Sequence, residues 1–279
     1  MDAIKEVLQN IEDYKTKDIE GCFRRLATVE NILSESDIKN EQLTQLVSLC
    51  IADQRKSIQK LGISAQKLLE KQEMERQRTA AMYMREMELW AKGTVAIAGI
   101  DEVGRGCVAG PVVAGVVILP MRPKLLHLND SKKLSANQRE RLDEQIREHA
   151  IDYAIGEVDA QRIDQIGIVK ATFEAMRLAV GQLVIEPDHL LIDAFRIPDL
   201  DVPQTNIVGG DGVSAAIAAA SIIAKVYRDR IMTDLHHQYP EYGFDNHKGY
   251  GTAEHMQQIS TYGLSPLHRR SFLKNIVFA

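Results

Sequence analysis

Four acidic residues stand where apolar, strand-like segments end, and this placement makes them the first candidates for chemistry. Asp101 and Glu102 lie in GIDEVGRG, residues 99–106, while Asp193 ends the apolar run of LLIDA and Asp211 follows NIVGG. A desolvated carboxylate demands a partner, and a divalent cation can be that partner. Taken singly, Asp211 is equally explained as a helix N-cap and Asp193 as a turn residue.

Acids at the ends of successive strands would converge on one edge of a sheet. Oxygen ligands without a nearby cluster of histidine or cysteine favour Mg²⁺ or Mn²⁺ over zinc. Two such ions about 4 Å apart would activate water and stabilise the leaving oxygen during attack at phosphorus. Strand geometry points Asp101 and Glu102 to opposite faces, so we expect the chain to bend there, with Gly104 and Gly106 supplying the freedom.

The glycines of residues 99–110, GIDEVGRGCVAG, do not form a dinucleotide-binding fingerprint. They lack the GxGxxG order, and they join two expected strands instead of opening a helix. The sequence also contains no GxxxxGKS phosphate loop and no GxSxG elbow. Hydride transfer, nucleoside triphosphate hydrolysis and serine hydrolysis are therefore disfavoured.

Groups that could bind a polyanion gather in the C-terminal part and in one loop. Tyr250 stands between two glycines in HKGYGT, which favours an exposed ring that stacks on a sugar or a base. Lys132 and Lys133 precede a helix N-cap and are expected either to hold phosphate or to be ordinary surface lysines. Arg269 and Arg270 are further candidate phosphate contacts. The same C-terminal stretch also contains His247, Lys248, His255 and His268.

The whole-chain composition indicates a globular protein. The chain has 279 residues, 45% of them hydrophobic, with a formal net charge of −5. This charge disfavours bulk attraction of nucleic acid, so a local basic groove and metal ions would have to neutralise phosphate. Three scattered cysteines fit neither a disulfide framework nor a zinc site, and no apolar run approaches a membrane span of about 20 residues. We therefore expect a cytoplasmic protein without a membrane segment.

Hydrophobic periodicity predicts an α/β fold behind an all-α N-terminal extension. Residues 1–92 have no proline and helical spacing of apolar residues, whereas residues 93–279 alternate strands and helices around a mixed sheet and end in a helical segment. Ser135 with Gln138 forms a capping box that starts one helix. The expected strands are 95–100, 112–119, 151–158, 190–192 and 206–208, and further helices are expected at 168–183 and 214–239.

The role of residues 1–92 is left open by their composition. Basic and acidic residues interleave there, which favours a small helical domain on a long helix. An accessory module that binds nucleic acid or a partner protein is the alternative.

Six sequence blocks, taken together and in order, resemble the ribonuclease HII family over about residues 95–272. They are GIDEVGRG, NDSKKLS, LLIDA, the GGD that precedes IAAASIIAKVYRD, HKGYGT and SPLHRRSF. The resemblance implies a ribonuclease H-like fold and a four-carboxylate site of Asp101, Glu102, Asp193 and Asp211. It also implies that Gly104, Arg105 and Gly106 recognise the 2′-hydroxyl of a ribonucleotide, and that Tyr250 completes this recognition against the neighbouring sugar.

We therefore expect a monomeric, Mg²⁺- or Mn²⁺-dependent endonuclease that acts on RNA–DNA hybrids and on ribonucleotides within duplex DNA, leaving 3′-hydroxyl and 5′-phosphate ends. Arg105 favours this family over the sister family ribonuclease HIII. Cys107, Gly209 and Leu264 depart from the family pattern of proline, lysine and proline. Two alternatives follow: a ribonuclease H-like nuclease without ribose selectivity, and a nucleic-acid-binding protein whose catalysis is weakened or lost.

Overall fold

The structure is a computed structural model, which describes residues 2–26, 37–121, 125 and 127–274. The chain forms two compact units, Met1–Arg78 and Thr79–Ala279. We call them the helical unit and the sheet unit. None of the described helices is both long and apolar enough to cross a membrane.

The helical unit is built around the apolar stripe that the sequence predicts. Leu43, Leu46, Val47 and Cys50 are all buried in one cluster with Ile58. Helix propensity alone does not hold such short helices in water, so burial of this stripe provides most of their stability. The described helices of this unit are α1 (Asp2–Gln9), η1 (Ile11–Asp13), α2 (Thr16–Leu26), α4 (Asp37–Ala52) and the first part of α5 (Lys56–Met82).

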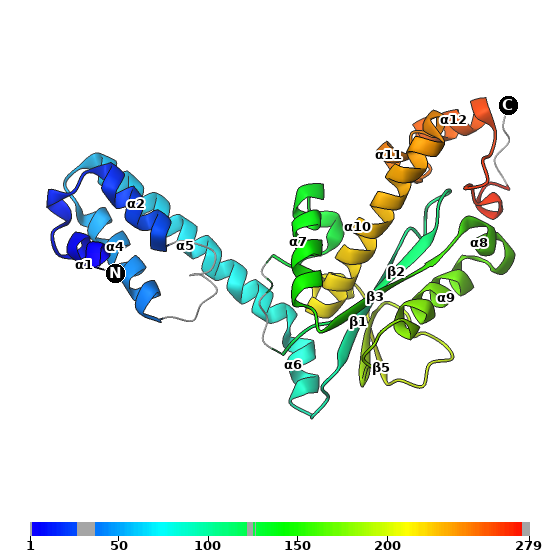
Figure 1. The fold of residues 1–279 in the computed structure, drawn as a ribbon, viewed down its shortest axis with the longest axis horizontal. Helices are drawn as coiled ribbons and strands as arrows, with labels where there is room; N and C mark the ends of the chain where they lie inside the picture. Colours follow the sequence, from blue (N-terminus) through cyan, green and yellow to red (C-terminus); the bar gives the residue numbers. More distant parts are fainter. Residues whose placement is uncertain (1, 27–36, 122–124, 126, 275–279) are drawn as a thin grey trace. The chain divides into compact units, whose positions relative to one another are not determined.

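The sheet unit contains a mixed five-stranded sheet in the order β3-β2-β1-β4-β5 (Figure 1). β1 runs antiparallel to β2 and parallel to β4, while β3 is antiparallel to β2 and β5 is parallel to β4. All five predicted strands are confirmed, with shifted ends. Their bounds are β1 (Ile97–Val103), β2 (Val112–Ile118), β3 (Asp152–Val158), β4 (His189–Asp193) and β5 (Gln204–Ile207).

Helices cover the two faces of this sheet (Figure 1). Along β2, Val117 packs in the cluster that contains α10 and α7, whereas Val116 packs in the cluster that contains α9, because successive side chains point to opposite faces. The capping box of Ser135 and Gln138 is confirmed at the start of α7. The helices are α6 (Met84–Trp90), α7 (Ala136–His149), α8 (Ala160–Ile166), α9 (Ile168–Gly181), α10 (Ala215–Gln238), α11 (Phe244–His247) and α12 (Ala253–Tyr262), with short 3₁₀ turns η2 (Ser131–Lys133), η3 (Gly210–Gly212), η4 (Pro240–Tyr242) and η5 (Arg270–Phe272).

The alanine-rich start of α10 lies directly on the sheet. A Cβ added to Gly99 of β1 would lie 2.0 Å from the carbonyl carbon of Ala216, so only glycine allows this approach. α9 makes a similar approach on the other face, where a Cβ on Gly156 would lie 2.1 Å from the Ala175 carbonyl oxygen. The small residues of AAIAAAS therefore fix how closely α10 packs against β1.

The contacts place α6 with the sheet unit, although residues 1–92 were expected to form one segment. Glu86 is 1% exposed, and its Oε1 accepts hydrogen bonds from the Ser214 hydroxyl at 2.6 Å and from the Ala216 N–H at 2.9 Å. These donors stand at the N-terminus of α10, where a carboxylate is favourable. The compact unit therefore begins at Thr79, before the change in composition at Gly93.

Candidate active site

Strand register brings Asp101 and Asp193 to the same edge of the sheet. β1 and β4 are parallel, and Ile100 pairs with Ile192, so each acid stands one residue beyond a matched pair. Asp101 remains inside β1, opposite Gly115 of β2, and β1 continues to Val103. The expected bend at the adjacent acids is therefore wrong: the chain turns only after both of them.

Asp211 is held beside this edge by the loop that follows β5. The N–H of Gly210 donates to Asp193 Oδ1 at 2.7 Å, which ties the GGD turn to the end of β4. Asp211 is 9% exposed, and burial raises its pKa, with Asp130 and Asp193 adding to the effect. Ser214, and not Asp211, caps α10 through a hydrogen bond from the Ile217 N–H. The helix-cap explanation of Asp211 is therefore wrong.

The carboxylates at this edge influence one another's ionisation. Asp101 is 6% exposed, and burial raises its pKa to about 8, with repulsion from Glu102 and Asp193 adding to the shift and a hydrogen bond from Ser221 opposing it. Burial also raises the pKa of Glu102, which Arg105 opposes and Asp193 reinforces. Mutual repulsion among buried acids is the condition that a bound cation would relieve.

The donor chemistry of this edge fits a hard divalent cation. Within the described ranges, no three acidic, histidine or cysteine side chains converge closely enough to form a metal cage. Mg²⁺ is typically bound by one or two carboxylates, with water and substrate phosphate completing its shell. Asp101, Glu102, Asp193 and Asp211 offer oxygen donors of this kind, and their charges interact, although no three of them form a closed cage in the described structure.

The NDSKKLS loop places a lysine and a further acid against the carboxylates. Burial disfavours the charge of Lys132, but Asp211, Asp130 and Asp101 outweigh it and raise its pKa. Lys132 thus faces the acidic edge, whereas Lys133 is exposed, with its Nζ 3.9 Å from Asp130. Asp130, which was not among the predicted site residues, caps η2 and interacts with Asp211.

Ser221 also lies beside Asp101, although it was not among the predicted site residues. It is a buried polar residue within the alanine-rich part of α10, and its Oγ lies 2.9 Å from the Ser131 Oγ. Its hydroxyl also lowers the pKa of Asp101, against the effect of burial. A serine on an otherwise apolar helix face is the sequence signal that could have identified it.

The turn that carries Arg105 is shaped by its two glycines in different ways. Gly104 has a φ of 83°, and a Cβ there would lie 2.1 Å from Arg228 Nε. A Cβ on Gly106 would meet nothing within 4 Å, so the folded chain itself does not require glycine there. The Arg105 guanidinium lies 3.7 Å from Glu102 Oε1 and 5.1 Å from the ring centre of Phe195, an exposed aromatic residue that the sequence analysis did not identify.

Arg269 and Arg270 have different environments. Arg269 is fully buried, and its guanidinium donates to the carbonyl oxygens of Gly110 at 2.8 and 3.0 Å and of Arg105 at 3.1 Å. The expected phosphate contact of Arg269 does not fit this position; the side chain instead supports the glycine turn. The Arg270 side chain is exposed and remains available.

Tyr250 is 41% exposed, as its position between two glycines predicts. Burial of its hydroxyl raises its pKa, and Cys107 adds to the shift. Cys107 also donates its S–H to the Lys248 carbonyl oxygen at 3.7 Å. Arg228, which is buried in α10, donates to the same oxygen at 2.8 Å. The residue before Gly249 and Tyr250 is therefore anchored from two sides.

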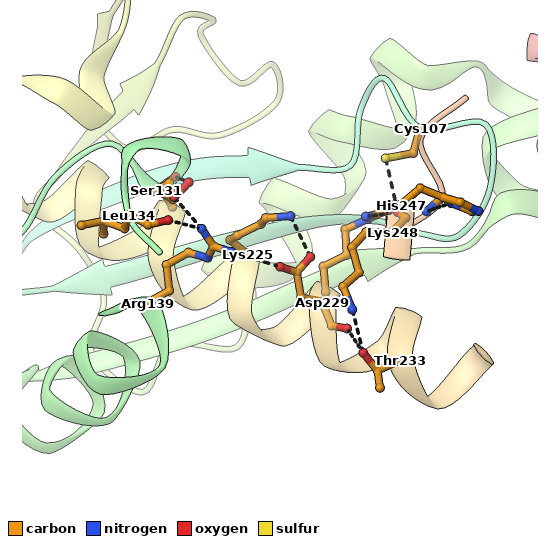
Figure 2. A network of polar contacts seen from close by, with 12 residues as sticks. Cys107, Ser131, Leu134, Arg139, Lys225, Asp229, Thr233, His247 and Lys248 are labelled. Carbon is orange, nitrogen blue, oxygen red and sulfur yellow. Dashed lines mark hydrogen bonds and ion pairs between the residues drawn. The ribbon is translucent and has the colours of Figure 1, made fainter. Parts of the chain in front are cut away.

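A polar network runs along α10 between the loop of Ser131 and the HKGYGT segment (Figure 2). Arg139 donates to the carbonyl oxygens of Ser131 and Leu134, and its NH2 lies 3.8 Å from Asp229. Asp229 also accepts from Lys225 at 2.7 Å. One turn further along, Thr233 accepts a hydrogen bond from Lys248 Nζ at 2.8 Å. These contacts link the loop of Ser131 to the HKGYGT segment through a single helix.

Solved structures identify the class of protein that this fold and site define. The ribonuclease H2 from Pyrococcus horikoshii OT3 has a TM-score of 0.56 and 28% identity, over 63% of this chain and 93% of that chain. The RNase HII in the PCNA complex from Archaeoglobus fulgidus has a TM-score of 0.53 and 26% identity, over 63% and 94%. The sheet unit is thus a ribonuclease H-like α/β fold, and the expected fold class is confirmed.

Sequence comparison identifies the family. The Ribonuclease HII family model matches residues 98–275, and the Ribonuclease HII N-terminal domain model matches residues 26–90. Ribonuclease HII of Clostridioides difficile strain 630 is 48% identical over 237 residues, or 85% of this chain and 93% of that protein. The Acetivibrio thermocellus protein of the same name is 52% identical over 207 residues, or 74% and 81%. The chain therefore belongs to the ribonuclease HII family, and it is a metal-dependent endoribonuclease.

Proposed function

We propose that the chain hydrolyses the RNA strand of RNA–DNA hybrids and cuts at single ribonucleotides embedded in duplex DNA, with two divalent ions and with 3′-hydroxyl and 5′-phosphate products. Cleavage of RNA in RNA–DNA hybrids is the activity of the family. The observation that carries the finer proposal is the parallel register of Asp101 and Asp193, with Asp211 tied to the same edge through Gly210.

The four carboxylates, Asp101, Glu102, Asp193 and Asp211, are the proposed ligands and catalytic residues. Mg²⁺ or Mn²⁺ bound there would supply water activation and stabilisation of the leaving oxygen. Lys132 would limit the repulsion between the acids before substrate arrives, because its charge interacts with Asp211, Asp130 and Asp101. Ser221 would help to orient Asp101, since its hydroxyl favours the ionised form of that carboxyl.

Recognition of the ribose is assigned to Gly104, Arg105, Gly106 and Tyr250. The open space around Gly106 supports close approach of a sugar to the backbone of this turn. The half-exposed ring of Tyr250 offers a flat surface for the neighbouring sugar. Lys132, Lys133 and Arg270 are the proposed phosphate contacts, which would supply local positive charge on an acidic protein.

The decisive experiment uses a duplex that contains one ribonucleotide. We expect Mg²⁺-dependent cutting on the 5′ side of the ribonucleotide, and we expect Asp101→Asn to lower kcat by more than about a thousandfold because a charged ligand is lost. Gel mapping of the product ends gives the cut position, and the time course of product formation gives kcat. Thermal melting and duplex binding of the variant show that the fold is retained. Unchanged turnover of Asp101→Asn would contradict the assignment.

An all-DNA duplex of the same sequence is the matched control for selectivity. Cutting of both duplexes at similar rates would favour a ribonuclease H-like nuclease without ribose selectivity. Binding of the ribonucleotide-containing duplex without any metal-dependent cutting would favour a chain that has lost catalysis.

A further inference from the structure

Three buried histidines lie behind Tyr250, and the mechanism proposed above does not use them. His247, His255 and His268 are 8%, 0% and 2% exposed. The rings of His247 and His255 are stacked with centroids 4.1 Å apart, and those of His255 and His268 are 5.2 Å apart. The three side chains come from α11, from α12 and from the segment before η5, so the cluster joins separate parts of the chain.

Hydrogen bonds determine which nitrogen of each ring carries the proton. The N–H of Ser265 donates to His268 Nδ1 at 3.0 Å, so the proton of His268 is on Nε2. His268 Nε2 lies 3.1 Å from His255 Nε2, which must therefore accept. His255 then carries its proton on Nδ1, which donates to the Tyr250 carbonyl oxygen at 2.9 Å. We call this chain from Ser265 to Tyr250 the histidine relay.

His247 fixes the chain on the other side of Tyr250. The N–H of Gly249 donates to His247 Nδ1 at 3.2 Å, and His247 Nε2 donates to the Tyr242 carbonyl oxygen at 2.7 Å. His247 thus holds the residue before Tyr250, while His255 holds the carbonyl group of Tyr250 itself. The peptide groups on both sides of the exposed ring are restrained by imidazoles.

Backbone hydrogen bonds join the segment of Tyr250 to residues 108–109, which follow the glycine turn of Arg105. The Gly249 carbonyl oxygen accepts from the N–H groups of Val108 at 2.9 Å and Ala109 at 3.2 Å. On the other side of this segment, the Arg269 N–H donates to the Val108 carbonyl oxygen at 2.8 Å. Residues 108–109 therefore lie between the HKGYGT segment and the segment that carries His268, and the relay closes this arrangement.

The relay requires uncharged rings. Burial lowers the pKa of His255 to about 4, with a smaller contribution from His247, and it lowers the pKa of His268 to about 4, with a contribution from His255. A proton added to His255 would place two N–H groups against each other at the 3.1 Å contact with His268, and a proton added to His268 would place its Nδ1–H against the Ser265 N–H at 3.0 Å. Both rings are therefore neutral at pH 7, and their tautomers are fixed.

We propose that His255 and His268 are positioning residues, which hold the backbone of Tyr250 through the relay and so keep its ring at a set distance from the Gly104–Gly106 turn. This inference rests on the proposed role of Tyr250 in recognising the sugar. It assigns His255 the direct contact, and it assigns His268 the task of keeping His255 in the tautomer that donates to Tyr250.

Nitrogen NMR of the imidazole rings in the wild-type protein tests the relay without reference to activity. At pH 7 we expect a protonated Nδ1 for His255 and a protonated Nε2 for His268 and for His247. The variants His255→Asn and His268→Gln assign the signals. A protonated Nε2 or an imidazolium at His255 would overturn the proposal.

A pair of substitutions at His255 tests the functional consequence. The amide nitrogen of His255→Asn can replace the Nδ1 donor to Tyr250, whereas His255→Leu removes it. We expect kcat/KM on a single-ribonucleotide duplex to be on the order of tenfold lower for His255→Leu than for His255→Asn, because one buried hydrogen bond is lost. Thermal melting of both variants shows whether each one is folded.

The same pair in a Tyr250→Ala background separates positioning from a general structural effect. If His255 acts through Tyr250, the two variants should then differ by less than about twofold in kcat/KM. A difference that persists in that background, or no difference in the wild-type background, would overturn the inference. If Tyr250→Ala alone leaves kcat/KM unchanged, the role of Tyr250 fails and positioning fails with it, while the nitrogen spectra still show whether the relay exists.

Discussion

At the scale of single residues, the site contains buried acids, and burial disfavours their ionised forms in the metal-free protein. The pKa of Asp101, raised mainly by burial to about 8, predicts that the metal-free protein loses stability as the pH rises from about 4 to about 8, because ionisation is easier in the unfolded chain. Asp101→Asn cannot ionise. In a chelator, its melting temperature should exceed that of the wild type by roughly 5–10 °C at pH 9 and by little at pH 4–5. A constant difference across this range would show that Asp101 is already ionised in the folded protein.

Adjacent arginines provide a second prediction at this scale. Arg269→Leu should lower the free energy of unfolding by about 3 kcal/mol, because the Gly110 and Arg105 carbonyl groups lose their buried donor. Arg270→Gln removes an exposed charge and should change the free energy of unfolding by about 0.5 kcal/mol or less. Instead it should raise KM, and it should reduce the slope of log binding constant against log salt concentration by roughly one. Denaturant titration and binding at several salt concentrations measure the two effects.

At the scale of elements, the approach of α10 to β1 sets the geometry of the site. Gly99→Ala would place a Cβ 2.0 Å from the Ala216 backbone, which cannot move aside as a flexible side chain does. We expect the free energy of unfolding to fall by about 3 kcal/mol or more. We also expect Ser221 to move away from Asp101. Gly106→Ala is the matched control, since its Cβ meets nothing: its melting temperature should be unchanged while cleavage of the ribonucleotide duplex falls. Equal melting temperatures for both variants would contradict this account of α10.

At the scale of the whole molecule, the chain can be cut at two different positions. The change in composition places a boundary at residue 92. The N-terminal family model ends at residue 90 and the ribonuclease HII model begins at residue 98, whereas the sheet unit begins at Thr79. A fragment of residues 93–279 lacks Met82, Tyr83 and Glu86, which are buried against the start of α10 or in the cluster around it. We expect the 79–279 fragment to unfold cooperatively at a melting temperature at least several degrees above that of 93–279, as measured by circular dichroism. Equal stability would show that α6 is dispensable to the sheet unit.

The sequence by itself determined which elements form and which acids are candidates. Alternating and continuous apolar runs identified all five strands, and the Ser135 capping box identified the start of α7, because these signals are local and repeat at the period of the structure. Their positions at the ends of apolar runs made the four acids candidates, and the family resemblance added the assignment of all four to one site and the roles of the residues of the glycine turn. The exposed position of Tyr250 also followed from its two flanking glycines.

Only the tertiary structure decided what these residues contact. Arg269 and Arg270 are adjacent residues of the same type, yet Arg269 is fully buried under the glycine turn and Arg270 is exposed. Likewise, the pairing of Ser221 with Asp101, of Glu86 with α10 and of His255 with Tyr250 joins residues whose spacing carries no periodic signal. Burial and hydrogen-bond partners are properties of the packed chain, since they depend on which distant segments exclude water from the same space.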